Sequence, residues 1–280
     1  MTGAVRRGLR RVYGDVPAVR PLMRQVRQVL IPPHFSGWGM ATDHADPWDD
    51  PAWANFGQAQ EDMSTDVEHG LLVDTDVSAA MLHELRWRHW IVAFCVRYAL
   101  CFERAGGSRD LALVECGVGD GLSAYFACHE ANYQVSRSVD VSYVMHCYDA
   151  WGPMAEGDLL PTERLHRNGY ANSSLERTRR NLRRFGDRVI FHPGHVPESF
   201  EAGPAAPERV AYLSVDLNAA KPTVAALEHF LPRLTPRGVV LMDDYGHRPY
   251  VDTKRAIDQF FSTQPGAVLK FPTGQAAYLA

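Results

Sequence analysis

Several short apolar segments of the chain end in an acidic residue, and this spacing could gather the acidic residues in one place. They are Glu115, Asp149, Asp216, Asp243 and Asp244. If the segments are parallel strands of one sheet, their carboxyl ends open on the same side, where α/β sheets bind ligands. Like charges gathered there repel one another. The pattern therefore predicts a crevice that receives a cationic ligand or a metal ion.

The last three of these carboxylates offer the hard oxygen ligands that suit Mg²⁺. A hydroxyl bound to such an ion has a lowered pKa, which makes an alkoxide or phenolate accessible near neutral pH. Taken alone, Asp243 and Asp244 are also typical of a helix cap or a solvated surface, and Asp216 of a loop or ribose contact. Taken together, the three residues indicate a metal site.

Around Glu115, the sequence LALVECGVGDG combines an apolar run, a carboxylate and three alternating glycines, Gly117, Gly119 and Gly121. Glycine allows positive φ and lets a ligand approach the backbone closely. We expect a buried strand, a tight turn and a helix over residues 122–131. A carboxylate at Glu115 favours an ammonium group and disfavours a phosphate. A dinucleotide turn, whose helix amides hold pyrophosphate, is the alternative, as is a purely structural turn.

Asp149 ends the second predicted strand, where a carboxylate can accept both ribose hydroxyls of a nucleoside. Its distance along the chain from Glu115 exceeds the usual interval of ~20 residues, and residues 132–140 are the expected insertion. Asp140 is a weaker candidate for the same role.

The elements that must position these residues alternate between strands and helices. Strands are expected at residues 111–114, 143–148, 189–192, 210–215 and 239–242, and helices at 173–185, 223–231 and 252–261. Residues 267–271 and 276–279 flank Pro-Thr-Gly, which predicts a terminal hairpin. Together they predict an α/β fold with a Rossmann-like, mostly parallel seven-stranded sheet, helices on both faces and an antiparallel C-terminal edge.

Upstream of this pattern, residues 1–64 are expected to form a helical and loop extension, and residues 65–280 the main domain. Residues 1–35 carry an amphipathic basic pattern that suits packing or dimerisation, or a membrane surface. Residues 36–64 are rich in tryptophan and turn residues, which predicts a loop that either caps an active site or lies as a strap on the core. Residues 65–104 predict one helix.

The segment AYLSVDLNAAKPTVAALEHFLPRLTPRGVVLMDDYG resembles the C-terminal signature of the macrocin O-methyltransferase family of class I S-adenosylmethionine (SAM) methyltransferases. VECGVGDGLS resembles motif I of that family, and YDAWG the stretch after its second strand. SSLERTRRNLRRFG and FHPGHVPESF resemble its next helix and third strand. The resemblance covers residues 65–261, and the DDYG block is its most specific part.

The resemblance implies Mg²⁺-dependent transfer of a methyl group from SAM to a hydroxyl of a secondary metabolite, a sugar-bearing natural product. The implied cofactor contacts are Glu115, Cys116, Gly117, Gly119, Gly121, Ser123, Asp149, Ser174, Gly194, His195 and Asp216. The implied metal ligands are Asp216, Asp243 and Asp244. Asp216 is the first candidate for the general base, and the alternatives are His195, His247, Lys221 and the pair Glu68 and His69.

The chain departs from the family pattern near the acceptor. The usual Asp-Gly-Asp at the fourth strand is Asp216-Leu217-Asn218 here, and Lys221 follows. Arg237 stands where the family has glycine. The metal ligands are retained, whereas the neighbourhood of the acceptor differs.

The composition sets further limits on function. The chain has 280 residues, 46% of them hydrophobic and 22% charged, and a net charge of −4 that gives no reason to expect nucleic acid. No apolar run approaches ~18 residues, so no membrane span is expected, and the basic start lacks the apolar segment of a secretory signal. The five cysteines form no C-x-x-C pair, which predicts reduced thiols in a cytoplasmic protein. The N-terminal helix would allow a homo-oligomer.

Three other functions fit the same patterns. One is a metal-independent N- or C-methyltransferase of the same fold. Another is a SAM- or nucleoside-binding protein without catalysis, and the third is an NAD-dependent oxidoreductase. Chelation of metal, the position of the methyl group in the product and a thermal-shift comparison of SAM with NAD separate them.

Overall fold

A computed structural model describes residues 46–70, 84–103, 110–137 and 141–279. Residues 46–280 form one compact unit, separate from residues 1–45. The features expected in residues 1–45, and Asp140, lie outside the described ranges.

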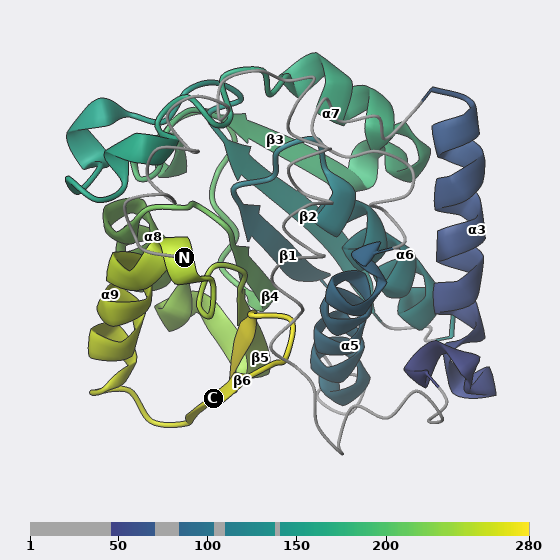
Figure 1. Cartoon of the computed structure of the whole chain (residues 1–280). Coiled ribbons are helices and arrows are strands. Elements are labelled where there is room, and N and C mark those ends of the chain that lie inside the picture. Colours follow the sequence, from purple (N-terminus) through teal and green to yellow (C-terminus); the bar gives the residue numbers. More distant parts are fainter. Residues whose placement is uncertain (1–45, 71–83, 104–109, 138–140, 280) are drawn as a thin grey trace, which may run out of the picture. The chain divides into compact units, whose positions relative to one another are not determined.

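The centre of the described unit is a seven-stranded sheet with the strand order β3-β2-β1-β4-β5-β7-β6 (Figure 1). The strands are β1 (Asp110–Cys116), β2 (Ser142–Asp149), β3 (Val189–Pro193), β4 (Val210–Val215), β5 (Leu234–Met242), β6 (Ala267–Lys270) and β7 (Ala276–Leu279). Strands β1 to β5 pair in parallel, and β7 is antiparallel to both β5 and β6. The expected parallel sheet with an antiparallel C-terminal hairpin is confirmed.

Helices cover both faces of this sheet, as expected (Figure 1). They are α3 (Ala54–Glu68), α5 (Arg86–Glu103) and α6 (Leu122–Ser136) on one face, and α8 (Ala220–Phe230) and α9 (Val251–Phe261) on the other. Side chains alternate along a strand, and β1 follows this rule. Leu111 and Leu113 belong to the core under α5 and α6, whereas Ala112, Val114 and Cys116 belong to the core under α8 and α9.

The N-terminal part of the described unit corrects the sequence prediction. Instead of one helix over residues 65–104, α3 begins at Ala54 and ends at Glu68, and α5 begins at Arg86. The start of α3 lies inside the segment predicted as a loop, because Phe56, Ala59 and Met63 recur at helical spacing and are buried.

Aromatic residues just before α3 and at its start pack on α5 and α6. The Trp53 ring lies 5.1 Å from Trp90 of α5, and the Phe56 ring lies 5.5 Å from Phe126 of α6. The two interpretations of residues 36–64, a cap on an active site or a strap on the core, stay predictions. None of the described helices is both long and apolar enough to cross a membrane. All five cysteines are free thiols, and only Cys101 is exposed.

Candidate active site

Backbone hydrogen bonds hold the carboxyl ends of the central strands side by side. Gly117 N donates to Tyr148 O at 2.8 Å, Asp216 N to Cys116 O at 2.8 Å, and Asp243 N to Val215 O at 3.0 Å. Three carboxylates also face the same side of the sheet. In each strand, the residue two positions earlier belongs to the core under α5 and α6: Leu113, Cys147 and Leu241. By the alternation of side chains, Glu115, Asp149 and Asp243 point to that side.

The glycine-rich turn follows β1 and packs against the end of β4. A Cβ atom on Gly117, whose φ is +87°, would lie 2.0 Å from the carbonyl oxygen of Asp216, so only glycine fits there. Gly119 also has positive φ, but a Cβ atom there would meet no atom within 4 Å. The turn is therefore packed on one side and leaves open space at Gly119.

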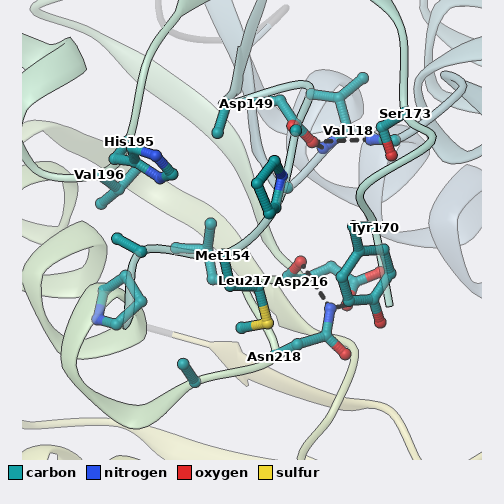
Figure 2. A pocket seen from close by; sticks show the side chains of 18 of the residues that line it. Val118, Asp149, Met154, Tyr170, Ser173, His195, Val196, Asp216, Leu217 and Asn218 are labelled. Carbon is teal, nitrogen blue, oxygen red and sulfur yellow. Dashed lines mark hydrogen bonds between the residues drawn. The ribbon is translucent and has the colours of Figure 1, made fainter. Parts of the chain in front are cut away.

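Asp149 fixes the shape of this turn. Its Oδ2 atom accepts hydrogen bonds from Val118 N at 2.7 Å (Figure 2) and from Gly119 N at 2.9 Å. Its Oδ1 atom accepts one from Trp151 N at 2.5 Å. The Gly119 carbonyl accepts from the Trp151 indole and the Thr178 hydroxyl. Both oxygens of Asp149 thus already hold backbone amides, and its role as a ribose acceptor stays a prediction.

Glu115 lies against the cavity with one oxygen unsatisfied. The residue is 2% exposed, and its Oε2 atom has no hydrogen-bond partner in the described part of the chain. Burial raises the pKa of this carboxyl well above its usual range, and the nearby charges of Asp243 and Asp149 raise it further. A buried, unsatisfied carboxyl oxygen is costly, so this position fits a cationic hydrogen-bond donor such as the ammonium group of SAM.

Asp216, Asp243 and Asp244 lie together, as the strand pattern predicts. Each offers a carboxylate oxygen, and the three oxygens lie within 4.8 Å of one another. Burial and the neighbouring carboxylates raise the pKa of Asp216 well above its usual range and that of Asp244 to about 7. Three oxygen donors of this kind fit Mg²⁺, and the role of these residues as metal ligands stays a prediction. We call them the acidic triad.

The sequence prediction missed the groups that surround the acidic triad. Arg88 of α5 forms an ion pair with Asp243, and Gln275 Nε2 donates to Asp243 Oδ1 at 3.0 Å. Asn218 donates from its backbone to Asp244 and from its side chain to Asp216. A signal for Arg88 was present, because an arginine within an otherwise apolar helix face needs a buried acidic partner.

The cavity at these strand ends has a volume of about 260 Å³ and includes most of the predicted cofactor residues. Those that line it are Glu115, Gly117, Gly119, Ser123, Asp149, Gly194, His195 and Asp216. Figure 2 shows His195 and Val196 on one side of the cavity and Tyr170 and Ser173 on the opposite side.

Three predicted cofactor residues do not line the cavity. The Cys116 side chain lies in the core under α8 and α9. A Cβ atom on Gly121 would meet Leu182, so this glycine packs against the segment after α7 (Leu175–Asn181). Ser174 caps α7 by accepting from Arg177 N, and its neighbour Ser173 lines the cavity instead.

Only some of the candidate general bases line the cavity. Asp216 and His195 line the cavity. Lys221 lies near it but donates to the carbonyl of Gly157 at 2.8 Å. The lining residues do not include His247, nor Glu68 and His69 at the exposed end of α3.

One wall of the cavity comes from the segment between β2 and α7, residues 150–173, which the sequence did not identify. Met154, Leu159 and Tyr170 line the cavity from this segment. Glu163 anchors it: the buried carboxylate accepts from Leu160 N within the segment and from Ala220 N at the start of α8, both at 2.8 Å.

Within this wall, Tyr170 reaches the acidic triad. Burial raises the pKa of the Tyr170 hydroxyl, and the charge of Asp216 and a hydrogen bond with Tyr250 raise it further. Figure 2 shows Tyr170 beside Asp216 and Asn218. The cavity is therefore lined by the glycine-rich turn at one end, and by Asp216 of the acidic triad and Tyr170 at the other.

Comparison with known proteins gives the first independent information on identity. Residues 114–245 match a family model described as a methyltransferase domain. The match spans β1 to the end of β5, which includes the glycine-rich turn and the acidic triad.

Two curated relatives match part of the chain. A tetracenomycin 4'-O-methyltransferase from Streptomyces olivaceus, whose name specifies a dimethoxy-rhamnosyl substrate, is 35% identical over 140 residues, 48% of this chain and 52% of the relative. The mycinamicin III 3''-O-methyltransferase of Micromonospora griseorubida is 39% identical over 76 residues, 26% of this chain and 29% of the relative. The chain thus spans about half the length of the first relative and less of the second.

Two solved structures share the fold. The O-methyltransferase NovP superposes with a TM-score of 0.56 at 21% identity, covering 69% of this chain and 78% of its own. The calicheamicin methyltransferase CalS11 superposes with a TM-score of 0.53 at 15% identity, covering 85% of this chain and 98% of its own. At these identities the likeness concerns the fold alone.

Proposed function

We propose that this chain, whose residues 114–245 match a methyltransferase domain, transfers a methyl group from SAM to a hydroxyl oxygen of a small molecule. The observation that carries this proposal is the unsatisfied oxygen of Glu115 at the glycine-rich turn. It supports a cationic donor at one end of the cavity, while Asp216, the member of the acidic triad that lines the other end, suits an acceptor hydroxyl.

In the proposed reaction, a methyl group leaves the sulfur of SAM and bonds to the acceptor oxygen. The products are S-adenosylhomocysteine and a methyl ether, and the hydroxyl proton passes to a base. Asp216 is our choice for that base, because it lines the cavity and its raised pKa makes it a stronger proton acceptor than an ordinary carboxylate. His195 is the alternative base that lines the same cavity.

The proposal includes Mg²⁺ held by Asp216, Asp243 and Asp244. A divalent cation held at this position would lower the pKa of a hydroxyl beside it. The fit rests on three carboxylate oxygens within 4.8 Å of one another and on the raised pKa of Asp216 and Asp244, which positive charge would relieve.

For the acceptor, we propose a sugar-bearing natural product. The support is the names of the two curated relatives, which methylate hydroxyls of such compounds. The segment around Asn218 and Lys221 departs from the family pattern, so the proposal covers the class of acceptor and neither the sugar nor the methylated position.

The test combines chelation with product analysis. We expect EDTA to abolish formation of S-adenosylhomocysteine with a panel of rhamnosylated aromatic polyketides and macrolide glycosides, and added Mg²⁺ to restore it. Asp243→Ala should lose activity and its dependence on metal together. Locating the methyl group by NMR identifies the acceptor atom. Full activity in EDTA, or a methyl group on nitrogen or carbon, would favour the metal-independent alternative.

A further inference from the structure

Asp243 differs from the other members of the acidic triad because a protein cation already holds it. Arg88 Nη2 forms an ion pair with Asp243 Oδ2, and Arg88 Nη1 donates to the carbonyl of Thr273 at 3.0 Å. The other oxygen of Asp243 accepts from Gln275 Nε2 at 3.0 Å. Both oxygens of Asp243 are therefore engaged by donors from α5 and from the turn between β6 and β7.

Among the described residues, the hydrogen-bond donors to the other two carboxylates are neutral. Asn218 N donates to Asp244 Oδ2 at 3.0 Å, and Asn218 Nδ2 donates to Asp216 Oδ1 at 3.1 Å. The charge of Arg88 nevertheless reaches both, since it lowers the pKa of Asp216 and Asp244 against the effect of burial. Arg88 thus acts as the counter-ion of three carboxylates that would otherwise repel one another.

We propose that Arg88 and a divalent cation are alternative partners of Asp243, so that Arg88 must release Asp243 before a metal ion binds the acidic triad. This inference rests on the metal site of the proposed function. A guanidinium and a divalent ion on the same carboxylate oxygen repel each other, and Mg²⁺ demands near-ideal geometry at short distances that leave no room for a donor in between.

The structure also makes the release of Arg88 feasible. The side chains of Arg88 and Asp243 are 21% and 20% exposed, so water can replace their contact. Arg97, on the same helix, offers a matched comparison: it forms an ion pair with Glu130, and its side chain is 18% exposed. Arg97 is equally charged and nearly equally buried, but its partner lies outside the triad.

The experiment is a titration with Mn²⁺, followed by electron paramagnetic resonance and calorimetry, without SAM or acceptor. We expect Arg88→Gln to bind Mn²⁺ at least tenfold more tightly than the unmodified protein. Arg97→Gln should bind it with unchanged affinity, although its melting temperature falls. Arg88→Lys should lie between, because its ammonium keeps the charge but cannot contact Thr273 and Asp243 as a fork. If Arg88→Gln does not fold, the Mn²⁺ affinity of Arg88→Lys tests the inference.

Unchanged or weaker Mn²⁺ binding by a folded Arg88→Gln variant would overturn the inference, since Arg88 would then be a structural partner of Asp243 or an aid to metal binding. Absence of binding in every variant would also overturn it. Turnover with and without EDTA is measured separately, so a failure of this competition is distinguishable from a failure of methyl transfer.

Discussion

At the level of single residues, the cavity depends on where charge is left uncompensated. Glu115 keeps an unpartnered oxygen in a buried position, whereas both oxygens of the neighbouring carboxylate, Asp149, accept hydrogen bonds from backbone amides. The two carboxylates therefore have different roles: Asp149 shapes the glycine-rich turn, and Glu115 remains available to a ligand.

We expect Glu115→Gln to weaken SAM binding by roughly 10- to 100-fold, because a charge-assisted hydrogen bond becomes a neutral one. Calorimetry with SAM measures this. The melting temperature without ligand should not fall, since the substitution removes a buried charge that its neighbours repel. Glu198→Gln, an exposed neighbour of the cavity, is the control and should leave affinity unchanged. SAM affinity equal in both variants would contradict the assignment.

The sequence located the acidic triad because the three aspartates directly follow apolar strands, and parallel strands end at one edge. It could not locate Gln275, because that contact depends on how the last hairpin folds back over β5. It also placed Cys116 at the cofactor, although the side chain one position after Glu115 faces the opposite side of the sheet.

At the level of elements, the apolar strands were the reliable part of the prediction. Residues 210–215 match β4 without an error, because six buried residues in a row leave no other interpretation. Helix α3 was missed because Trp, Gly and Asp dominate its surroundings, and its buried residues contact α6 far along the chain. The wall formed by residues 150–173 contains little regular structure and so gave no periodic signal.

That wall is held to the rest of the molecule by Glu163, which is 2% exposed. Glu163→Gln replaces one acceptor oxygen by an amide, so either Leu160 N or Ala220 N loses its partner, at a cost of about 1–3 kcal/mol. We expect faster deuterium exchange in residues 150–173 and a raised KM for the acceptor.

Thr162→Ala is the matched control, because Thr162 contacts Asp252 at an exposed position of the same segment. It should change neither exchange nor KM. Exchange in residues 150–173 that is equal in the glutamine variant and the unmodified protein would show that Glu163 does not anchor the wall.

At the level of the whole molecule, buried titratable groups act on stability in opposite directions. Burial raises the pKa of Glu115, Asp216 and Asp244, so these groups stabilise the fold at low pH and lose that contribution as pH rises through their folded pKa. Burial lowers the pKa of several histidines, which act in the reverse sense. They are His89, to about 3, and His129, His146 and His192, to about 4.

These contributions to stability oppose one another, so the pH dependence of stability in one protein does not report on any single group. The difference in stability between a variant and the unmodified protein, followed across pH, does. His89 is 3% exposed and its ring stacks on Phe126 at 4.3 Å. The ordinary pKa of histidine is 6.5, so His89 binds a proton below pH 6.5 in the unfolded chain. In the folded protein His89 binds that proton only near pH 3. The stabilisation by neutral His89 is complete above pH 6.5 and is lost as pH falls toward 3.

We expect His89→Gln to lower the urea midpoint of unfolding most at pH 7.5, because the variant loses the stacking contact where neutral histidine contributes fully. The difference from the unmodified protein should shrink steadily at pH 6 and pH 5, since glutamine does not titrate. His69→Gln, at the exposed end of α3, is the control for the loss of an exposed histidine and should show no such trend. EDTA is present throughout, so that the acidic triad contributes equally to every variant. A difference for His89→Gln that stays constant across this range would mean that His89 titrates alike in the folded and unfolded states.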